Sequence, residues 1–213
     1  MTNEMINRIK AVLEMDLDTL VDPKDSYIIS YPHILKYFQG IDKFSVEDLV
    51  CGAHMIYGWM PTILHLHPNE VSLEGGVVIL KKVKESGYIP GKYNDLEKLA
   101  KLVNHSLVGA SKLLHFVAPE KFAIWDSLIY TYVFNEPASY NKLKKIDKYQ
   151  KYIHGLEETK KETGFEAFRR GVCAKIGDNN TEISAFRAIE LIMFLYARKN
   201  KHLLPFSVTP LTL

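Results

Sequence analysis

The segment from Ser184 to Lys199 constrains the fold of this chain more than any other stretch of its sequence. Read as a helix, SAFRAIELIMFLYARK carries apolar residues around nearly its whole circumference. Such a helix has to lie in the middle of a bundle, because each of its sides needs an apolar neighbour. Arg187 and Glu190 fall inside it one turn apart, so we expect both to be buried and paired with each other.

The rest of the chain has the spacing of further helices. Apolar residues recur every three or four positions over residues 3–20, and Ser45 and Ser72 have the pattern of helix N-caps. The helix after Ser45 is expected to end near Met60, because Pro61 disfavours helical geometry at the residue before it. Since strand-like alternation is scarce, the sequence predicts an all-α fold. The other expected helices cover residues 73–85, 94–104, 108–117, 126–134, 140–162, 164–175 and 182–199.

Three stretches leave their local structure or their role open. Residues 27–38 are rich in aromatic residues and contain Pro32, which is typical of an irregular segment or a short helix. The run from Val77 to Leu80 is β-branched and apolar, so a strand stays an alternative to a helix there. Residues 87–93, GYIPGKY, are rich in turn formers. They are the candidate boundary if the single domain consists of two lobes with a cleft.

Length and composition limit the classes of protein that this chain can belong to. Its 213 residues, 47% of them hydrophobic, suit one domain with an ample core. The formal charge of only +2 means that any nucleic-acid surface must come from local clustering of basic residues. Cys51 and Cys173 are too few for a four-cysteine zinc or iron–sulfur site, and both have apolar neighbours typical of core thiols. No cofactor is predicted.

The sequence favours a cytoplasmic protein. The N-terminal stretch MTNEMINRIKAVLEMDLDTL is amphipathic and lacks the basic and continuous apolar regions of a signal peptide. The apolar window over residues 183–196 is too short to span a membrane and contains charged residues. We therefore expect no membrane association, whereas the oligomeric state stays open.

Residues 106–134, SLVGASKLLHFVAPEKFAIWDSLIYTYVF, carry the main functional hypothesis. The pattern predicts a short helix from near Gly109, a turn containing Pro119, an extended approach to Trp125, and a new helix beginning at Asp126. This order resembles the core of the helix-hairpin-helix DNA glycosylases. In that family a glycine-rich hairpin leads into a helix bearing a lysine, and an extended stretch then leads to an aspartate at the next helix N-terminus.

The resemblance implies a role for each matching residue. Gly109 would be a hairpin glycine, with Ser111 as a second small residue, and backbone N–H groups would contact a DNA phosphate there. Lys112 would be the nucleophile that attacks the sugar of an extruded nucleotide and forms a Schiff base. Asp126 would stabilise positive charge on the sugar or deprotonate the nucleophile. The alternative is that Asp126 is an ordinary N-cap and Lys112 is solvated, although capping and catalysis can coincide.

A basic stretch is the second candidate for contact with nucleic acid. Residues 140–152 contain five lysines interleaved with tyrosines. Lysines can contact phosphates and tyrosines can stack on exposed bases, whereas a solvated helix face is the alternative. The lysines expected to bind DNA are Lys142, Lys144, Lys145 and Lys148.

Aromatic and histidine residues give further candidates. A pocket for an extruded base would be lined by Tyr57, Trp59, His115 and Trp125, for which core packing is the alternative. Gly58 would permit a close approach next to these residues. His65 and His67 resemble a fragment of a metal site, but no third ligand is evident near them and we predict no metal.

Three functions follow from these patterns. The leading hypothesis is a divergent DNA-glycosylase-like protein that binds or processes DNA. A noncatalytic helical module that binds a protein partner is the first alternative. A small-molecule enzyme on an unrelated helical fold is the second.

Overall fold

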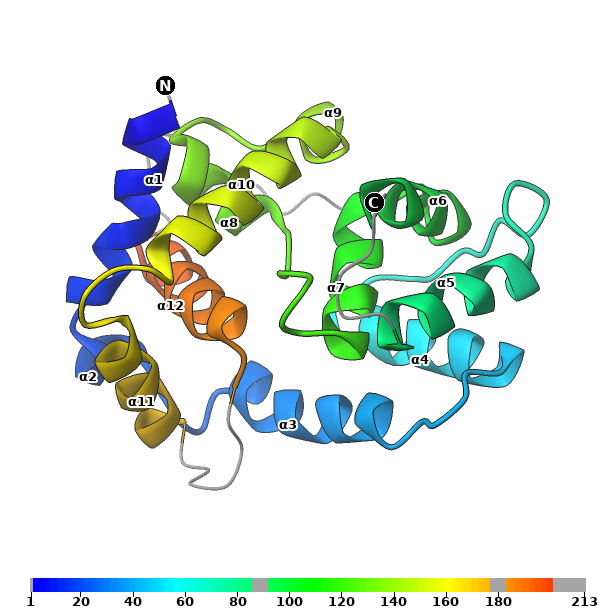
Figure 1. Ribbon diagram of the computed structural model, residues 1–213, viewed down its shortest axis with the longest axis horizontal. Coiled ribbons are helices and arrows are strands. Elements are labelled where there is room, and N and C mark those ends of the chain that lie inside the picture. Colours follow the sequence, from blue (N-terminus) through cyan, green and yellow to red (C-terminus); the bar gives the residue numbers. More distant parts are fainter. Residues whose placement is uncertain (1, 86–91, 177–182, 201–213) are drawn as a thin grey trace. The chain divides into compact units, whose positions relative to one another are not determined.

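The computed structural model describes residues 2–85, 92–176 and 183–200 of the chain. Within these ranges the structure contains helices and no strand, so the all-α prediction is confirmed (Figure 1). No helix of this part of the chain has the length and apolarity needed to cross a membrane. In chain order the elements are α1 (Thr2–Lys10), the 3-10 helix η1 (Ala11–Glu14), α2 (Leu17–Leu20), α3 (Ser26–Gln39), α4 (Val46–Trp59), α5 (Leu73–Glu85), α6 (Lys92–Leu102), α7 (Leu107–Val117), α8 (Ser127–Phe134), α9 (Tyr140–Leu143), α10 (Ile146–Thr159), α11 (Phe165–Lys175) and α12 (Ala185–Lys199).

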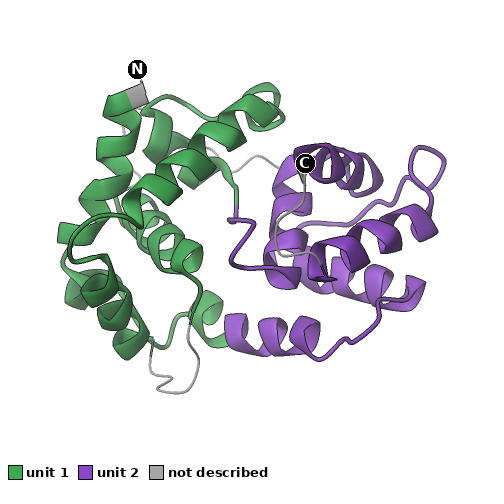
Figure 2. Ribbon diagram, in the orientation of Figure 1, with its two compact units in different colours: residues 1–29, 125–212 green, residues 30–124, 213 purple. Residues whose placement is uncertain are grey.

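The chain forms two compact units (Figure 2). Unit 1 consists of Met1–Ile29 and Trp125–Thr212, and unit 2 consists of Ser30–Ile124 with Leu213. The first division falls inside α3, and the second falls between α7 and α8. The expected lobe boundary at residues 87–93 lies mostly outside the described residues, and the helices that flank it, α5 and α6, belong to unit 2.

Unit 1 is organised by α12, which contacts α2, η1, α8 and α11, while α1 packs on α8 and α10 (Figure 1). The central residues of α12 are almost all buried, as its apolar circumference predicts. Arg187 and Glu190 are 3% and 1% exposed, and the Arg187 guanidinium donates a hydrogen bond to the Glu190 carboxylate. The expected buried ion pair is therefore confirmed.

Two long helices expected in unit 1 are each interrupted. Residues 3–20 form α1, η1 and α2, and the Asp16 carboxylate starts α2 by accepting the Asp18 N–H at 3.0 Å. Residues 140–162 form α9 and α10. Here the Leu143 carbonyl accepts a hydrogen bond from the indole N–H of Trp125 at 3.1 Å. The Trp125 indole thus occupies a carbonyl that would accept a backbone N–H in a continuous helix.

Unit 2 is a cluster in which α4, α5, α6 and α7 pack on one another. Ser45 and Asp48 form the reciprocal capping box at the start of α4, and the helix ends before Met60, as the sequence predicts. The run from Val77 to Leu80 is helical and lies within α5. Val78 alone of these four residues is exposed, at 62%, so burial follows the period of a helix and the strand alternative is wrong.

The aromatic stretch over residues 27–38 is also helical, with Pro32 inside α3. Tyr31, Leu35 and Phe38 are buried at spacings of three and four, so an apolar stripe holds this helix despite the missing proline N–H. The ammonium group of Lys84 donates to the carbonyls of Phe38 and Gln39, at 3.1 and 3.0 Å. A cation in this position stabilises the negative end of the α3 dipole.

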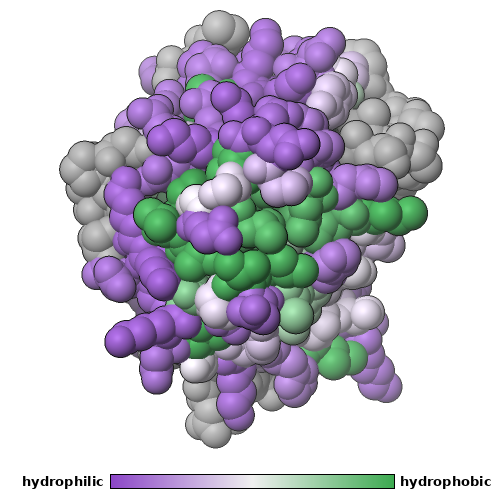
Figure 3. All heavy atoms as spheres, turned by 90° about the vertical axis from the view of Figure 1, so that its right-hand side faces the viewer, coloured by the Kyte–Doolittle hydropathy of each residue, from purple (hydrophilic) through white to green (hydrophobic). Residues whose placement is uncertain are grey.

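The surface of the molecule carries hydrophobic residues as well as an exposed cysteine. Figure 3 shows hydrophobic residues gathered in one area of the face that it displays. Among the described residues of unit 2, Ile63 and Val78 are the exposed large hydrophobic ones, at 77% and 62%. Cys51 is exposed on α4, so the prediction of a core thiol is wrong there, and Cys173 of unit 1 is only partly buried. The buried stripe of α4 passes on the other side of the helix, through Leu49, Ala53 and Ile56.

Candidate functional site

Residues 106–134 begin with the predicted helix, α7. The hydroxyl of Ser106 caps α7 by accepting the Gly109 N–H at 3.1 Å. After α7 the chain turns at Ala118, whose carbonyl accepts the N–H groups of Lys121 and Phe122 at 3.0 and 3.1 Å. The helix and the turn containing Pro119 are therefore confirmed as local structure.

Asp126 lies at the N-terminus of the next helix, as predicted. Its carboxylate accepts the Ile129 N–H at 2.9 Å, which makes it the N-cap of α8. Residues 122–126 before it form no regular element. Lys112 belongs to unit 2 and Asp126 belongs to unit 1.

A tight turn joins α6 to α7 without any glycine. Asn104 and His105 have φ angles of +54° and +50°, in the left-handed region that non-glycine residues rarely adopt. The Asn104 side chain holds the turn in place, since its amide donates to the Ile63 carbonyl at 2.8 Å and its oxygen accepts the His65 N–H at 2.6 Å. This turn, defined by residues 103–106, is the hairpin of the α6–α7 pair.

Gly109 does not lie in that hairpin. It is the third residue of α7 and is buried against Tyr57 of α4. A Cβ atom at Gly109 would lie 2.6 Å from Cζ and 2.9 Å from Cε2 of Tyr57, and closer still to its hydroxyl oxygen. Ser111 is also fully buried and donates to the Val108 carbonyl at 2.9 Å. Close helix packing, rather than a phosphate contact, therefore accounts for both small residues.

Lys112 is partly buried beside an aromatic ring. Its ammonium nitrogen lies 5.9 Å from the centre of the Trp59 ring. The Trp59 ring packs edge-on against Phe116, with 5.4 Å between the ring centroids, and its N–H donates to the Ser30 hydroxyl at 2.9 Å. The aromatic neighbour of Lys112 is therefore held in position by its own packing and hydrogen bond.

Three of the four expected pocket residues are instead buried in the two cores. His115 of unit 2 is 0% exposed, its Nε2 accepts from the Tyr31 hydroxyl at 2.8 Å, and its Nδ1 donates to the Phe122 carbonyl at 2.7 Å. Tyr57 is 2% exposed in unit 2, and Trp125 is 0% exposed in unit 1. Trp59 is the one of the four candidates that is partly exposed.

The four lysines of the basic stretch fall into two groups. Lys142 and Lys148 lie 3.1 and 3.2 Å from the two carboxylate oxygens of Glu136, which offsets part of their charge. Lys144 and Lys145 are exposed, and the Lys144 ammonium lies 4.5 Å from the centre of the Tyr140 ring. Lys144 and Lys145 are thus the better placed pair for contact with an anionic partner.

Glu136 makes the folded state of unit 1 sensitive to acid. A hydrogen bond from the Tyr130 hydroxyl, with smaller contributions from Lys142 and Lys148, lowers the pKa of Glu136 from 4.5 to about 2. A group whose pKa is lower in the folded state than in the unfolded state stabilises the fold at pH values above its unfolded pKa. This stabilisation is lost as the pH falls through its folded pKa. The window for Glu136 therefore runs from about pH 4.5 down to about pH 2.

We expect Glu136→Gln to lower the free energy of unfolding by about 1 kcal/mol or less at pH 7, because the carboxylate is partly exposed and screened. The difference from wild type should shrink steadily between pH 4.5 and pH 2. Urea unfolding followed by circular dichroism at pH 7, 4 and 3 measures it. A difference that stays constant across this series would contradict the assignment.

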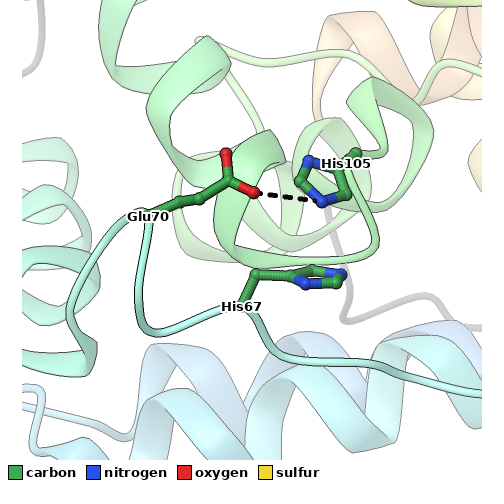
Figure 4. A group of neighbouring side chains, drawn as sticks. All are labelled: His67, Glu70 and His105. Atoms are coloured by element: carbon green, nitrogen blue, oxygen red, sulfur yellow. Dashed lines mark ion pairs between the residues drawn. The ribbon is translucent and has the colours of Figure 1, made fainter.

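Two histidines and a glutamate of unit 2 form a cluster that the sequence patterns did not reveal (Figure 4). One ligand atom from each of His67, Glu70 and His105 lies within 4.8 Å of the others. The Nε2 atom of His105 is 3.2 Å from a Glu70 carboxylate oxygen, and the centroids of the two imidazole rings are 4.2 Å apart. His65, the partner expected for His67, is not part of this cluster.

Part of this cluster leaves a signal in the sequence. His67 and Glu70 are separated by Pro-Asn, a spacing that a tight turn can bring together, and the Glu70 N–H donates to the His67 carbonyl at 3.1 Å. His105 follows only after α5 and α6 in the chain, so the tertiary structure alone places it there.

Comparison with known proteins adds no relative, because no family model, no curated protein and no solved structure matches the chain.

Proposed function

We propose that this chain binds DNA through the α6–α7 hairpin and acts on an abasic or damaged site with Lys112 as the nucleophile. One observation carries the proposal: Lys112 lies partly buried beside Trp59 on the helix that follows a tight left-handed turn. Hairpins of this kind between two packed helices can hold a phosphate without reading the sequence.

The order of the elements supports the same proposal. A lysine-bearing helix, a turn, an irregular stretch and an aspartate N-cap follow one another from α7 to α8. This is the order on which the resemblance to helix-hairpin-helix DNA glycosylases is based. Because Gly109 and Ser111 are buried and the Asn104 N–H already donates to the His65 carbonyl, we assign the phosphate contact to the backbone N–H of His105, which is partly exposed.

The chemistry at Lys112 is that of an amine and an aldehyde. At an abasic site the ring-opened sugar carries an aldehyde at C1′. The deprotonated amine of Lys112 adds to this carbon, and loss of water leaves a C=N Schiff base. Borohydride then delivers a hydride to the same carbon and gives a stable secondary amine that links protein and DNA.

Asp126 has its role in this proposal only from the resemblance to the glycosylases. In that family the matching carboxylate stabilises the positive charge that develops at C1′ when the bond to a damaged base breaks. The N-cap role can be separated from this one, because asparagine caps a helix about as well as aspartate. Asp126→Asn should therefore unfold like wild type while losing activity on a damaged base.

Borohydride trapping with abasic-site DNA tests the proposal. Wild type should give a covalent adduct that is absent in Lys112→Ala and present in Lys101→Ala, which removes an exposed lysine of α6. An equal adduct in Lys112→Ala and wild type would reject Lys112 as the nucleophile.

DNA binding measured over a salt series separates the remaining outcomes. Replacing both Lys144 and Lys145 by alanine should reduce the slope of log affinity against log salt by about 1 for each lysine. Binding without an adduct would leave a DNA-binding protein that lacks a lysine nucleophile. With neither binding nor adduct, the protein-interaction module becomes the better explanation.

A further inference from the structure

We infer that His67, Glu70 and His105 of unit 2 form a binding site for a divalent transition-metal ion, with Zn²⁺ as the ion to test. Two imidazole nitrogens and one carboxylate oxygen are a donor set that suits Zn²⁺ and related ions. The three ligand atoms already lie within 4.8 Å of one another.

The distances need only a small adjustment for a metal ion. Zinc bonds to nitrogen and oxygen are about 2.0–2.2 Å long, which puts neighbouring ligands of a tetrahedral site about 3.4 Å apart. The separation of 3.2 Å between His105 Nε2 and the Glu70 oxygen already agrees with this geometry. Side-chain rotation of His67, whose ring lies beside that of His105, completes the set (Figure 4).

Backbone hydrogen bonds hold the segments that carry the three ligands. Leu66 and Val103 form an antiparallel bridge between them. On either side of it, the His67 N–H donates to the Leu102 carbonyl at 2.9 Å, and the Asn104 N–H donates to the His65 carbonyl at 3.0 Å. The two histidines are therefore fixed in register by backbone groups, before any metal ion contributes.

The left-handed backbone at His105 contributes to the geometry. A φ angle of +50° is uncommon outside glycine, and it persists only where the surrounding structure determines it. At this position the backbone directs the His105 ring toward Glu70, as Figure 4 shows.

The cluster is accessible from solvent. The side chains of His105 and Glu70 are 41% and 47% exposed, so an ion can reach the ligands. Three protein ligands leave a coordination position of a tetrahedral ion for water or another small ligand. A simple His105–Glu70 ion pair explains their contact, but it gives no role to His67, which lies against the same imidazole ring.

Calorimetric titration of the full chain with Zn²⁺ near neutral pH tests the inference. We expect one ion per chain, and at least about tenfold weaker binding in each of His67→Ala, Glu70→Gln and His105→Ala. His65→Ala is the matched control, because it removes an exposed histidine from the same segment and should leave the affinity unchanged. Circular dichroism of all four variants checks that each is folded.

Co²⁺ serves as a spectroscopic probe of the same site. Wild type and His65→Ala should show the visible absorption of a four-coordinate cobalt ion, and the three ligand variants should lose it. Zn²⁺ binding that is equal in all five proteins, or that is absent from wild type, would overturn the inference. His67→Ala should also keep the borohydride adduct, so failure of the DNA proposal and failure of the metal site are distinguishable.

Discussion

Replacing Arg187 by methionine is expected to lower the free energy of unfolding by about 3–5 kcal/mol, because it removes the guanidinium that donates a hydrogen bond to the buried carboxylate of Glu190. Both residues belong to α12, which contacts most of the other helices of unit 1. A loss of this size is a large part of the stability of an ordinary domain, about 5–15 kcal/mol. Urea unfolding at pH 7, followed by circular dichroism, measures it.

A double replacement separates the buried charge from the lost contact. Arg187→Met combined with Glu190→Leu removes both charges and keeps similar volumes, so it should recover most of the stability lost in the single variant. Recovery would also be informative if Arg187→Met alone fails to fold. A double variant no more stable than the single one would contradict the explanation by the buried charge of Glu190.

Replacing Gly109 by alanine should lower the free energy of unfolding by about 2–3 kcal/mol, although alanine is the better helix former by about 1 kcal/mol. The added Cβ would overlap the ring of Tyr57, which is 2% exposed. Displacing this ring also strains the hydrogen bond from the Tyr57 hydroxyl to the Val103 carbonyl, which is 3.2 Å long. Thermal and urea unfolding both report the change.

The chain offers a matched control for this variant in α4. Gly58 follows Tyr57 and is exposed, and a Cβ atom added to it would meet no neighbouring side chain within 4 Å. Gly58→Ala should therefore stabilise the protein by about 0.5–1 kcal/mol. In a Tyr57→Leu background the cost of Gly109→Ala should fall by at least about 1 kcal/mol, because the overlapping ring is gone. An unchanged cost in that background would rule out the contact with Tyr57 as its cause.

The contrast between these two glycines shows where sequence reasoning reaches its limit. The sequence suggested a close approach at Gly58 and a hairpin at Gly109, and the structure places the close approach at Gly109 within a helix. A glycine pattern reports that a small residue is tolerated, but it does not say which neighbour requires it. The same limit applies to Tyr57, His115 and Trp125, since aromatic residues form cores and pockets from the same sequence pattern.

What the sequence by itself determined is local. Capping residues, proline positions and three-to-four spacing predicted most helices, the N-cap role of Asp126 and the buried pair of Arg187 and Glu190. These features depend on residues within one or two turns of each other, where short-range hydrogen bonds and the period of the helix decide the outcome.

What only the tertiary structure decided depends on contacts between residues distant in the chain. The break between α9 and α10 accompanies a bond from Trp125, and the cluster of His67, Glu70 and His105 depends on the pairing of two segments separated by α5 and α6. The division into two units likewise joins the N-terminal helices to the C-terminal half. Which residues meet in such contacts depends on which apolar helix faces pack together. The spacing of residues along one helix does not tell which other helix it packs against.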